Sequence, residues 1–485
     1  MIGIDQIERL FNPSGVIVIG ASTHPGKFGF VALHNVLNAG FEGPVLATNP
    51  QKPEILGIQS HAEVKDMPSG MADFAMICVS PDKVIPILPE LATIGVKTAF
   101  VVSGGFREVG EIGAKLEKEM LRVASECGIL IAGPNGQGLI STPADLCSQI
   151  VSPYPPKGNI SIASQSGNIL SAFMNLSRNA NIGIARGIST GNQGMVSIAD
   201  YLRYFGDDDE TSVIVTYIEG IPDGRAFYNA LSGTVKEKPV IVIRGGSTKS
   251  GASAAKSHTG SLASDHAIFT AMINQAGAFL ASDVEHAFEL AATFATQPLP
   301  KGNKVFVMTT AGGWGVITAD AIAKTDLTLE ILPDDLKEKI NKLLPARWSK
   351  SNPIDLAGGE TRDTIPELLS VILEHDEVDS LIFLGLGVQG NVARSYFESA
   401  FANKSTNRMA AFHTAQEKRY AEAVITNVKE FNKPIFVATE LAIADPANPG
   451  PETLREHGNV IHRSPITAVK CLAALTDYGA FLNTE

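Results

Sequence analysis

Near its start the sequence reads Val16-Ile17-Val18-Ile19-Gly20-Ala21-Ser22, an apolar, β-branched run that ends in small residues. The run favours a strand, and Thr23-His24-Pro25-Gly26-Lys27-Phe28-Gly29 then turns into an apparent helix. Glycines in such a turn let a diphosphate approach the N–H groups at a helix start, and Lys27 adds a cation. Because the spacing departs from GxGxxG, a tight turn without a ligand is the alternative interpretation.

The same alternation of strand and helix repeats along the chain. Apolar, strand-like runs occupy residues 16–19, 45–47, 74–79, 98–102 and 129–132, then 160–163, 213–218 and 240–243, and finally 305–308, 381–386 and 435–438. Most of the segments between them are long enough for helices. The pattern predicts the α/β fold class, with doubly wound parallel sheets that bind ligands at the carboxyl ends of their strands.

Two proline-rich connectors, residues 153–158 and 297–302, interrupt this alternation, and a new strand follows each of them. A chain of 485 residues is long enough for about three domains. We therefore expect three consecutive domains, at residues 1–150, 158–297 and 302–485.

The composition narrows the classes of function. A formal net charge of −12 argues against a nucleic-acid surface, because such surfaces need clustered Lys and Arg. No stretch resembles a membrane span, and the first residues do not resemble a secretory signal. The scattered cysteines form no metal-ligand pattern, so we expect no bound metal and a cytoplasmic location; they are Cys78, Cys127, Cys147 and Cys471.

Four further strand ends of the first domain carry small or turn-forming residues. They read Asn49-Pro50, Val79-Ser80-Pro81, Ser103-Gly104-Gly105-Phe106 and Gly133-Pro134-Asn135-Gly136-Gln137-Gly138. In a parallel sheet these ends share one edge. Together with the turn at Gly20 they outline a nucleotide crevice.

Two helix starts, one in each later domain, are flanked by hydroxyl-bearing and small side chains. The first reads Ser164-Gln165-Ser166-Gly167-Asn168, and the second reads Thr309-Thr310-Ala311-Gly312-Gly313-Trp314-Gly315. Free N–H groups and the helix dipole make such a start an anion site, and two starts aimed at one point would hold a phosphate. Each could instead be an ordinary capped helix.

A loop of small residues, 244–261, follows the strand at 240–243 and carries His258. It contains no large apolar side chain, so we expect it to move. A neutral imidazole can attack phosphorus when a partner holds its other ring nitrogen, and Glu219, at the end of another strand, is the predicted partner. We interpret the remaining histidines as solvated side chains: His24, His34, His61, His266, His286, His375, His413, His457 and His462.

The histidine motif reads Ser257-His258-Thr259-Gly260-Ser261-Leu262-Ala263, with Tyr217-Ile218-Glu219-Gly220, the Ser-Gln-Ser-Gly-Asn segment and Gly133-Pro134-Asn135 upstream. In these motifs the chain resembles the α subunit of ADP-forming, or nucleoside-diphosphate-forming, acetyl-CoA and acyl-CoA synthetases, which are relatives of succinyl-CoA synthetase. The resemblance covers nearly the whole chain, as far as Ser351-Asn352-Pro353-Ile354-Asp355-Leu356. It implies an N-terminal Rossmann-like CoA-binding domain followed by two flavodoxin-like domains.

The resemblance implies a ligase that interconverts acyl-CoA, phosphate and ADP with a small carboxylic acid, CoA and ATP through an acyl phosphate and a phosphohistidine. His258 would carry the phosphoryl group, and Glu219 would steady its imidazole. The implied phosphate-binding residues are Ser164, Gln165, Ser166, Gly167, Ala311, Gly312 and Gly313. The implied CoA-binding residues are Gly20, Ser22, Lys27, Asn49, Pro50, Ser80, Pro81, Ser103, Gly104 and Asn135.

We recognise no ATP-grasp segment in the sequence. The resemblance therefore implies a separate β subunit that binds ATP or ADP with Mg²⁺, in an α2β2 assembly, and a loop bearing His258 that swings between the two sites. Two residues depart from the family: Gly136 stands where Cys is frequent, and Trp314 where Pro is frequent. The indole of Trp314 would lie beside the phosphate site and reshape the acyl pocket.

Two other functions are compatible with parts of the sequence. A non-catalytic CoA or nucleotide sensor of the same fold is the alternative, and the presence of both His258 and Glu219 argues against it. A nicotinamide dehydrogenase is less consistent with the sequence, because Asn49-Pro50-Gln51-Lys52 stands where an acidic ribose partner is expected.

Overall fold

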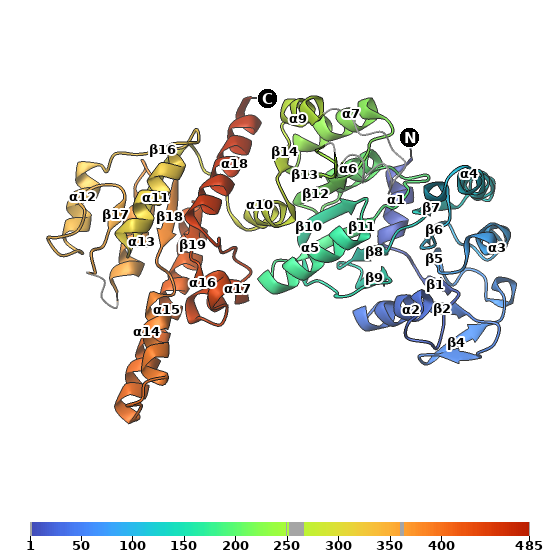
Figure 1. The fold of residues 1–485 in the computed structure, drawn as a ribbon, viewed down its shortest axis with the longest axis horizontal. Helices are drawn as coiled ribbons and strands as arrows, with labels where there is room; N and C mark the ends of the chain where they lie inside the picture. The colour runs from blue at the N-terminus through green and yellow to red at the C-terminus, as the bar shows by residue number, and fades with distance from the viewer. Residues whose placement is uncertain (1, 249, 252–265, 359–362, 485) are drawn as a thin grey trace. The chain divides into compact units, whose positions relative to one another are not determined.

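The computed structural model describes residues 2–248, 250–251, 266–358 and 363–484 (Figure 1). The chain forms two compact units, residues 1–179 with 183–291 and residues 180–182 with 292–485. The first unit holds two β-sheets and the second unit holds a third. Most strand neighbours are parallel, which confirms the α/β fold class. In the described chain, no helix has both the length and the apolar character needed to cross a membrane.

The first sheet has the strand order β3-β4-β2-β1-β5-β6-β7. Its strands are β1 Val16–Ile19, β2 Val45–Thr48, β3 Glu54–Ile55, β4 Ile58–His61, β5 Phe74–Ile77, β6 Thr98–Val101 and β7 Leu130–Ala132. Its helices are α2 Phe28–Ala39, α3 Pro81–Thr93 and α4 Glu111–Glu126, with short 3₁₀ turns η1 Val64–Asp66 and η2 Arg107–Val109. Strands β2 and β5 flank β1 on opposite sides, so the topological switch point lies between β1 and β5.

The second sheet has the order β14-β13-β12-β10-β11-β8-β9. Its strands are β8 Gly138–Ser141, β9 Leu146–Gln149, β10 Lys157–Ser164, β11 Ile184–Ser189, β12 Val213–Ile218, β13 Val240–Arg244 and β14 Phe279–Ala281. Its helices are α5 Gly167–Ala180, α6 Ile198–Asp207, α7 Gly224–Val235, α9 His266–Gln275 and α10 Val284–Thr296. Here the switch point lies between β10 and β12, and β8 and β9 form an antiparallel edge.

The third sheet has the order β16-β15-β18-β19, and β17 also pairs with β15. Its strands are β15 Lys304–Thr309, β16 Thr328–Leu329, β17 Ile354–Asp355, β18 Ser380–Leu384 and β19 Ile435–Ala438. Its helices are α11 Gly312–Ile322, α12 Asp334–Asn341, α13 Thr364–Glu374, α14 Val388–Phe397, α15 Lys404–Phe431, α16 Leu441–Ala444, α17 Pro449–Glu456 and α18 Pro465–Thr484. The switch point lies between β15 and β18.

Helix α1 (Ile4–Phe11) lies between the two sheets of the first unit (Figure 1). Phe11 stacks on Tyr204 of α6, with ring centroids 5.3 Å apart. Arg186 of β11 is 2% exposed and pairs with Asp208 at the end of α6, with Nη2 and Oδ1 3.2 Å apart. Arg186 Nη1 also donates to Asn12 Oδ1 at 3.2 Å. The buried guanidinium thus joins α1, β11 and α6.

Replacing Arg186 with Met should lower the free energy of unfolding of the first unit by about 3–5 kcal/mol, because Asp208 would stay buried without its cation. Urea unfolding with a probe in the first unit measures this loss. Arg122→Met is the matched control, because Arg122 pairs with Glu119 and Glu126 on the exposed surface of α4. We expect no measurable change for the control. Equal losses in both variants would contradict the assigned role of Arg186.

Each predicted strand is present within a few residues of its expected bounds. The prediction missed β11, whose run carries the buried Arg186 and Gly187, and the short hairpin of β8 and β9. It also missed the short strands β3, β4, β14, β16 and β17. Sheet pairing changes between β7 and β8, whereas the predicted boundary at residue 150 falls after β9. The domain ranges 1–150, 158–297 and 302–485 stay a prediction.

Candidate functional site

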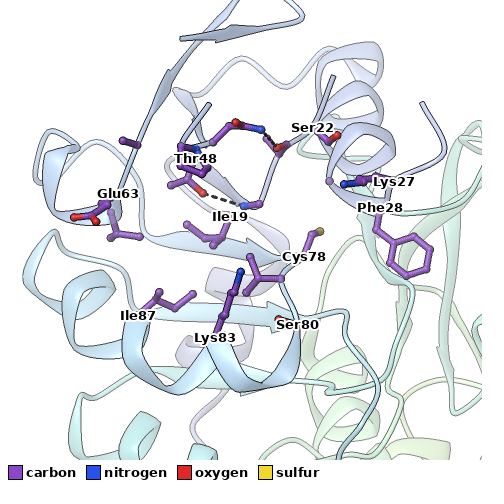
Figure 2. A pocket seen from close by; sticks show the side chains of 18 of the residues that line it. Ile19, Ser22, Lys27, Phe28, Thr48, Glu63, Cys78, Ser80, Lys83 and Ile87 are labelled. Atoms are coloured by element: carbon purple, nitrogen blue, oxygen red, sulfur yellow. Dashed lines mark hydrogen bonds between the residues drawn. The ribbon is translucent and has the colours of Figure 1, made fainter. Parts of the chain in front are cut away.

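A cavity of about 870 Å³ lies at the switch point of the first sheet (Figure 2). Its walls come from the carboxyl ends of β1, β2 and β5, and from the first turns of α2 and α3. Six predicted CoA-binding residues line it: Gly20, Ser22, Lys27, Asn49, Pro50 and Ser80. Switch points of open parallel sheets are where such folds bind ligands.

The turn after β1 brings the start of α2 against the strand end. Gly20 has a φ of 81°, and its N–H donates to Thr48 Oγ1 at 2.9 Å. A Cβ on Gly29 would lie 2.0 Å from the carbonyl oxygen of Gly20, so no larger residue fits there. Lys27 occupies the N-cap of α2, and no side chain caps the helix. The first N–H groups of α2 therefore remain available to an anion.

Two lysines add positive charge to this cavity. Figure 2 shows Lys27 beside Ser22 and Lys83 reaching from α3 toward Ile19. Lys65 also lines the cavity but pairs with Glu63. Within the part of the chain that the structure describes, Lys27 and Lys83 form no ion pair.

Lys83 was not among the residues predicted from the sequence. It lies in the first turn of α3, directly after the strand end at Ser80. A lysine at this position could have been predicted from the sequence to face a ligand at the strand end.

Other lining groups shape the walls. Asn49 Nδ2 donates to the Ala21 carbonyl at 2.8 Å, and its Oδ1 accepts from the N–H of Gln51 at 2.8 Å. Asn49 thus ties the ends of β1 and β2 together. Burial raises the pKa of the Cys78 thiol to about 12, so this thiol stays protonated near neutral pH and is a poor nucleophile.

Four predicted CoA residues do not line this cavity: Pro81, Ser103, Gly104 and Asn135. Asn135 and Gly104 lie instead where the first sheet meets the second. Asn135 Nδ2 donates to Asn192 Oδ1 at 3.4 Å. Asn192 Nδ2 donates to Glu108 at 2.7 Å and to Glu117 at 2.8 Å. Their contact with CoA stays a prediction.

The switch point of the second sheet joins Gln165 to Glu219. The carboxamide of Gln165 donates through Nε2 to the Gly220 carbonyl at 2.7 Å. Its Oε1 accepts from the N–H groups of Glu219 and of Gly220, the latter at 3.0 Å. The backbone N–H of Gln165 donates to the Tyr217 carbonyl at 3.1 Å. The structure therefore brings Glu219 beside the start of α5, and the side chain of Gln165 holds it there.

Tyr217 completes this group. Burial, the charge of Glu219 and a hydrogen bond to Glu219 raise the pKa of the Tyr217 hydroxyl to about 12. A Cβ on Gly245 would lie 2.5 Å from the Tyr217 hydroxyl and 3.3 Å from Glu219 Cγ. The segment after β13 therefore begins against these two side chains. His258 itself lies outside the described residues, as does the rest of 252–265.

The start of α5 is shaped by hydroxyl groups and by Gln137. Ser164 Oγ donates to the Ser166 carbonyl at 2.7 Å and accepts from the Ser166 N–H at 3.2 Å. A Cβ on Gly167 would lie 2.3 Å from Gln137 Cδ, so Gln137 rests directly on the helix start. Gln137 Nε2 donates to Asn168 Oδ1 at 2.9 Å. From the sequence, Gln137 was predicted only as part of a turn.

The second unit repeats the turn at the start of α11. Thr309 Oγ1 donates to the Ala311 carbonyl at 2.8 Å and accepts from the Ala311 N–H at 3.0 Å. No side chain caps α11, but the Asp355 carboxylate lies 2.6 Å from where a Cβ on Gly312 would be. Trp314 is 38% exposed. Phosphate binding by Ala311, Gly312 and Gly313 stays a prediction.

The start of α14, a helix of the third sheet, is occupied by a side chain of the protein itself, that of Glu417. Glu417 is 1% exposed, and its two carboxylate oxygens accept from the N–H groups of Gly387 at 2.7 Å and Gly390 at 3.0 Å. Burial raises the pKa of this carboxyl group above its usual value. The start of α14 is thus satisfied from within the chain.

Three family models match consecutive segments: a CoA binding domain over residues 15–141, a succinyl-CoA ligase like flavodoxin domain over 157–294 and a ligase-CoA domain over 305–396. The α subunit of the ADP-forming acetate–CoA ligase II of Pyrococcus furiosus is 37% identical over 377 residues, which are 78% of this chain and 82% of that subunit. The α subunit of ligase I of the same organism is 33% identical over 477 residues, 97% of each chain.

The chain belongs to the family of ADP-forming acyl-CoA ligases.

Within these ligases the chain corresponds to the α subunit. A solved structure of the acetyl-coenzyme A synthetase 1 of Ca. Korarchaeum cryptofilum, in complex with phosphate and ADP, matches with 32% identity and a TM-score of 0.85, over 99% of this chain and 98% of that one. Other relatives are longer, and the chain spans 54% and 50% of two of them. The predicted family, the CoA-binding first domain and the flavodoxin-like second domain are confirmed.

In this ligase, Gly29→Ala should destabilise the first unit by about 1–3 kcal/mol and weaken CoA binding at least tenfold, because the methyl group collides with the Gly20 carbonyl. Urea unfolding and calorimetric titration with CoA measure the two effects. The control is Gly233→Ala in α7, where a Cβ meets nothing within 4 Å. We expect it to be neutral or stabilising, as alanine usually is inside a helix. Unchanged CoA affinity in Gly29→Ala would contradict the site.

Proposed function

We propose that this ligase chain converts acyl-CoA, phosphate and a nucleoside diphosphate to a carboxylic acid, CoA and the triphosphate, and catalyses the reverse, with His258 as the phosphoryl carrier. The observation that carries the proposal is the group at the second switch point. There, Glu219 is fixed beside the start of α5 by Gln165, in the same unit as the cavity of the first sheet. A catalytic carboxylate and an anion-binding helix start are the parts that phosphohistidine chemistry needs.

Each group of residues has a separate role in the reaction. CoA lies in the cavity of the first sheet, with its phosphates near the start of α2, Lys27 and Lys83. Phosphate at the start of α5 attacks the thioester carbonyl, the C–S bond breaks, and the CoA thiolate takes a proton. A ring nitrogen of His258 then attacks phosphorus, and the P–O bond to the acyl group breaks to release the carboxylate. Glu219 accepts a hydrogen bond from the N–H of the other ring nitrogen and so stabilises the charged imidazole.

The final step transfers the phosphoryl group to a nucleoside diphosphate. We propose that an ATP-grasp β subunit binds this nucleotide with Mg²⁺, in an α2β2 assembly. Support comes from the relatives that are named as α subunits. The cysteines of the described chain are free thiols, which suits a reducing compartment, and we propose the cytoplasm.

Incubation with a candidate ATP-grasp partner and labelled ATP tests the phosphohistidine. We expect acid-labile label on His258, none in His258→Ala, and CoA affinity within twofold of the wild type in that variant. His266→Ala is the matched control, because His266 is an exposed histidine at the start of α9. Absence of label, with a partner that is shown to bind nucleotide, would favour a CoA sensor. Loss of CoA binding in His258→Ala would assign the loop a structural role.

Lys83→Ala should weaken CoA binding by roughly tenfold or more, because a hydrogen-bonded or paired charge contributes about 1.5–3 kcal/mol. The loss should shrink as salt is raised. Titration calorimetry at two ionic strengths measures both effects. Lys118→Ala, an exposed lysine on α4 away from the cavity, is the control. If both variants bind CoA as the wild type does, Lys83 does not contact the ligand.

A further inference from the structure

We propose that Tyr217 and Gln165 are positioning residues for phosphoryl transfer, and that they fix the Glu219 carboxylate against the beginning of the loop that carries His258. This inference rests on the proposed role of Glu219. It gives Gln165 a different task from the direct phosphate contact expected from sequence, and it assigns a task to Tyr217, which the sequence analysis left without one.

The direction of the side chains on β12 is the first argument. Tyr217 lies near the end of β12 and Glu219 directly follows the strand. A Cβ on Gly245 would meet both the Tyr217 hydroxyl and Glu219 Cγ, so the two side chains lie on the same side. Ile218 points to the other side, where it lines a small, mostly apolar cavity of about 80 Å³ with Ile198 of α6 and Phe227 of α7. Tyr217 and Glu219 therefore share the side of the sheet opposite α6 and α7.

The fixation of the backbone is the second argument. One carboxamide, that of Gln165, accepts from two successive N–H groups, those of Glu219 and Gly220, and donates to the Gly220 carbonyl at 2.7 Å. Gln165 is 8% exposed, so these bonds are shielded from water. Both the oxygen and the nitrogen of the Gln165 carboxamide are bonded, so any rotation of this group would break a hydrogen bond. The peptide that carries Glu219 is therefore held in one orientation.

The approach of the loop is the third argument. Gly245 follows β13 directly, and its N–H donates to the Ile218 carbonyl at 2.9 Å. Any side chain at this position would meet the Tyr217 hydroxyl at 2.5 Å. The chain that leads to His258 therefore leaves the sheet in contact with the hydroxyl that binds Glu219.

The chemistry follows from these contacts. The Tyr217 hydroxyl lies next to Glu219, since a Cβ on Gly245 would meet both side chains. It stays protonated at neutral pH, since burial and Glu219 raise its pKa to about 12, and it can therefore donate to the carboxylate. A carboxylate has about four lone-pair sites, so it can accept from Tyr217 and from a second donor at the same time. The second donor in the reaction is the ring N–H of His258. Tyr217 acts through Glu219 and does not itself contact phosphate, so removing its hydroxyl should affect the transfer rate and leave CoA binding unchanged.

A double-mutant cycle tests this inference in the full chain with its nucleotide-binding partner. The rate of phosphohistidine formation from labelled ATP is measured in single-turnover experiments for Tyr217→Phe, Glu219→Gln and the double variant. We expect a roughly tenfold fall for Tyr217→Phe, a larger fall for Glu219→Gln, and no further fall in the double variant, because residues that act as one unit are not additive. Gln165→Met should resemble Tyr217→Phe.

Tyr201→Phe is the matched control, because the buried Tyr201 hydroxyl has no hydrogen-bond partner among the described residues. It should keep the wild-type rate. CoA affinity should stay within twofold of the wild type in all these variants. Additive losses in the double variant, or a wild-type rate in Tyr217→Phe, would overturn this inference while leaving the proposed function intact. A wild-type rate in Glu219→Gln would instead refute the role of Glu219 in the proposed function, and this inference with it.

Discussion

The carboxamide of Gln165 holds together the two strand ends on which the proposed chemistry depends. It stands at the end of β10 and satisfies three backbone groups after β12, across the point where the order of the second sheet reverses. At a switch point the connections that leave two adjacent strands run to opposite faces of the sheet, and a crevice forms at the carboxyl ends of these strands. Here the buried side chain of Gln165 bridges the two strand ends and fixes the backbone at Glu219.

The same topology explains why the three sheets each place a helix start at the switch point. Each sheet has its switch point beside its first long parallel strand, β1, β10 or β15, and the helix that follows that strand begins at the crevice. In α2 and α11 no side chain caps the helix start. Helix starts that the protein leaves uncapped are suited to anions, and the family to which the chain belongs uses anionic substrates.

The sequence was sufficient for the fold class, because apolar strands and glycine-rich turns are local signals. It was insufficient for β11, because Arg186 and Gly187 interrupt the apolar run, and only the long-range pairing of Arg186 with Asp208 makes a charged residue acceptable there. Glu219 was predicted as a site residue from its motif, and its role stays a prediction. Lys83 and Gln137 were not, since their relevance comes from helices and turns that approach from elsewhere in the chain.

The placement of predicted site residues shows a similar division. Residues of the turns after β1 and β2 line the cavity, whereas Ser103 and Asn135, which follow β6 and β7, do not. All of these residues were predicted to bind CoA because they follow the carboxyl ends of strands in one sheet. That edge of the sheet extends beyond the cavity, so a position on it is not sufficient to place a residue in the cavity. The distal part of this edge is occupied by the contact between Asn135 and Asn192 of the second sheet.

The buried carboxylate of Glu417 has a consequence for selectivity. By placing its own oxygens on the N–H groups of Gly387 and Gly390, the chain withdraws the start of α14 from competition for ligand. Helix starts whose N–H groups have no internal partner can each bind an anion such as phosphate. With this start satisfied by a buried internal carboxylate, an anionic ligand could bind there only by displacing Glu417.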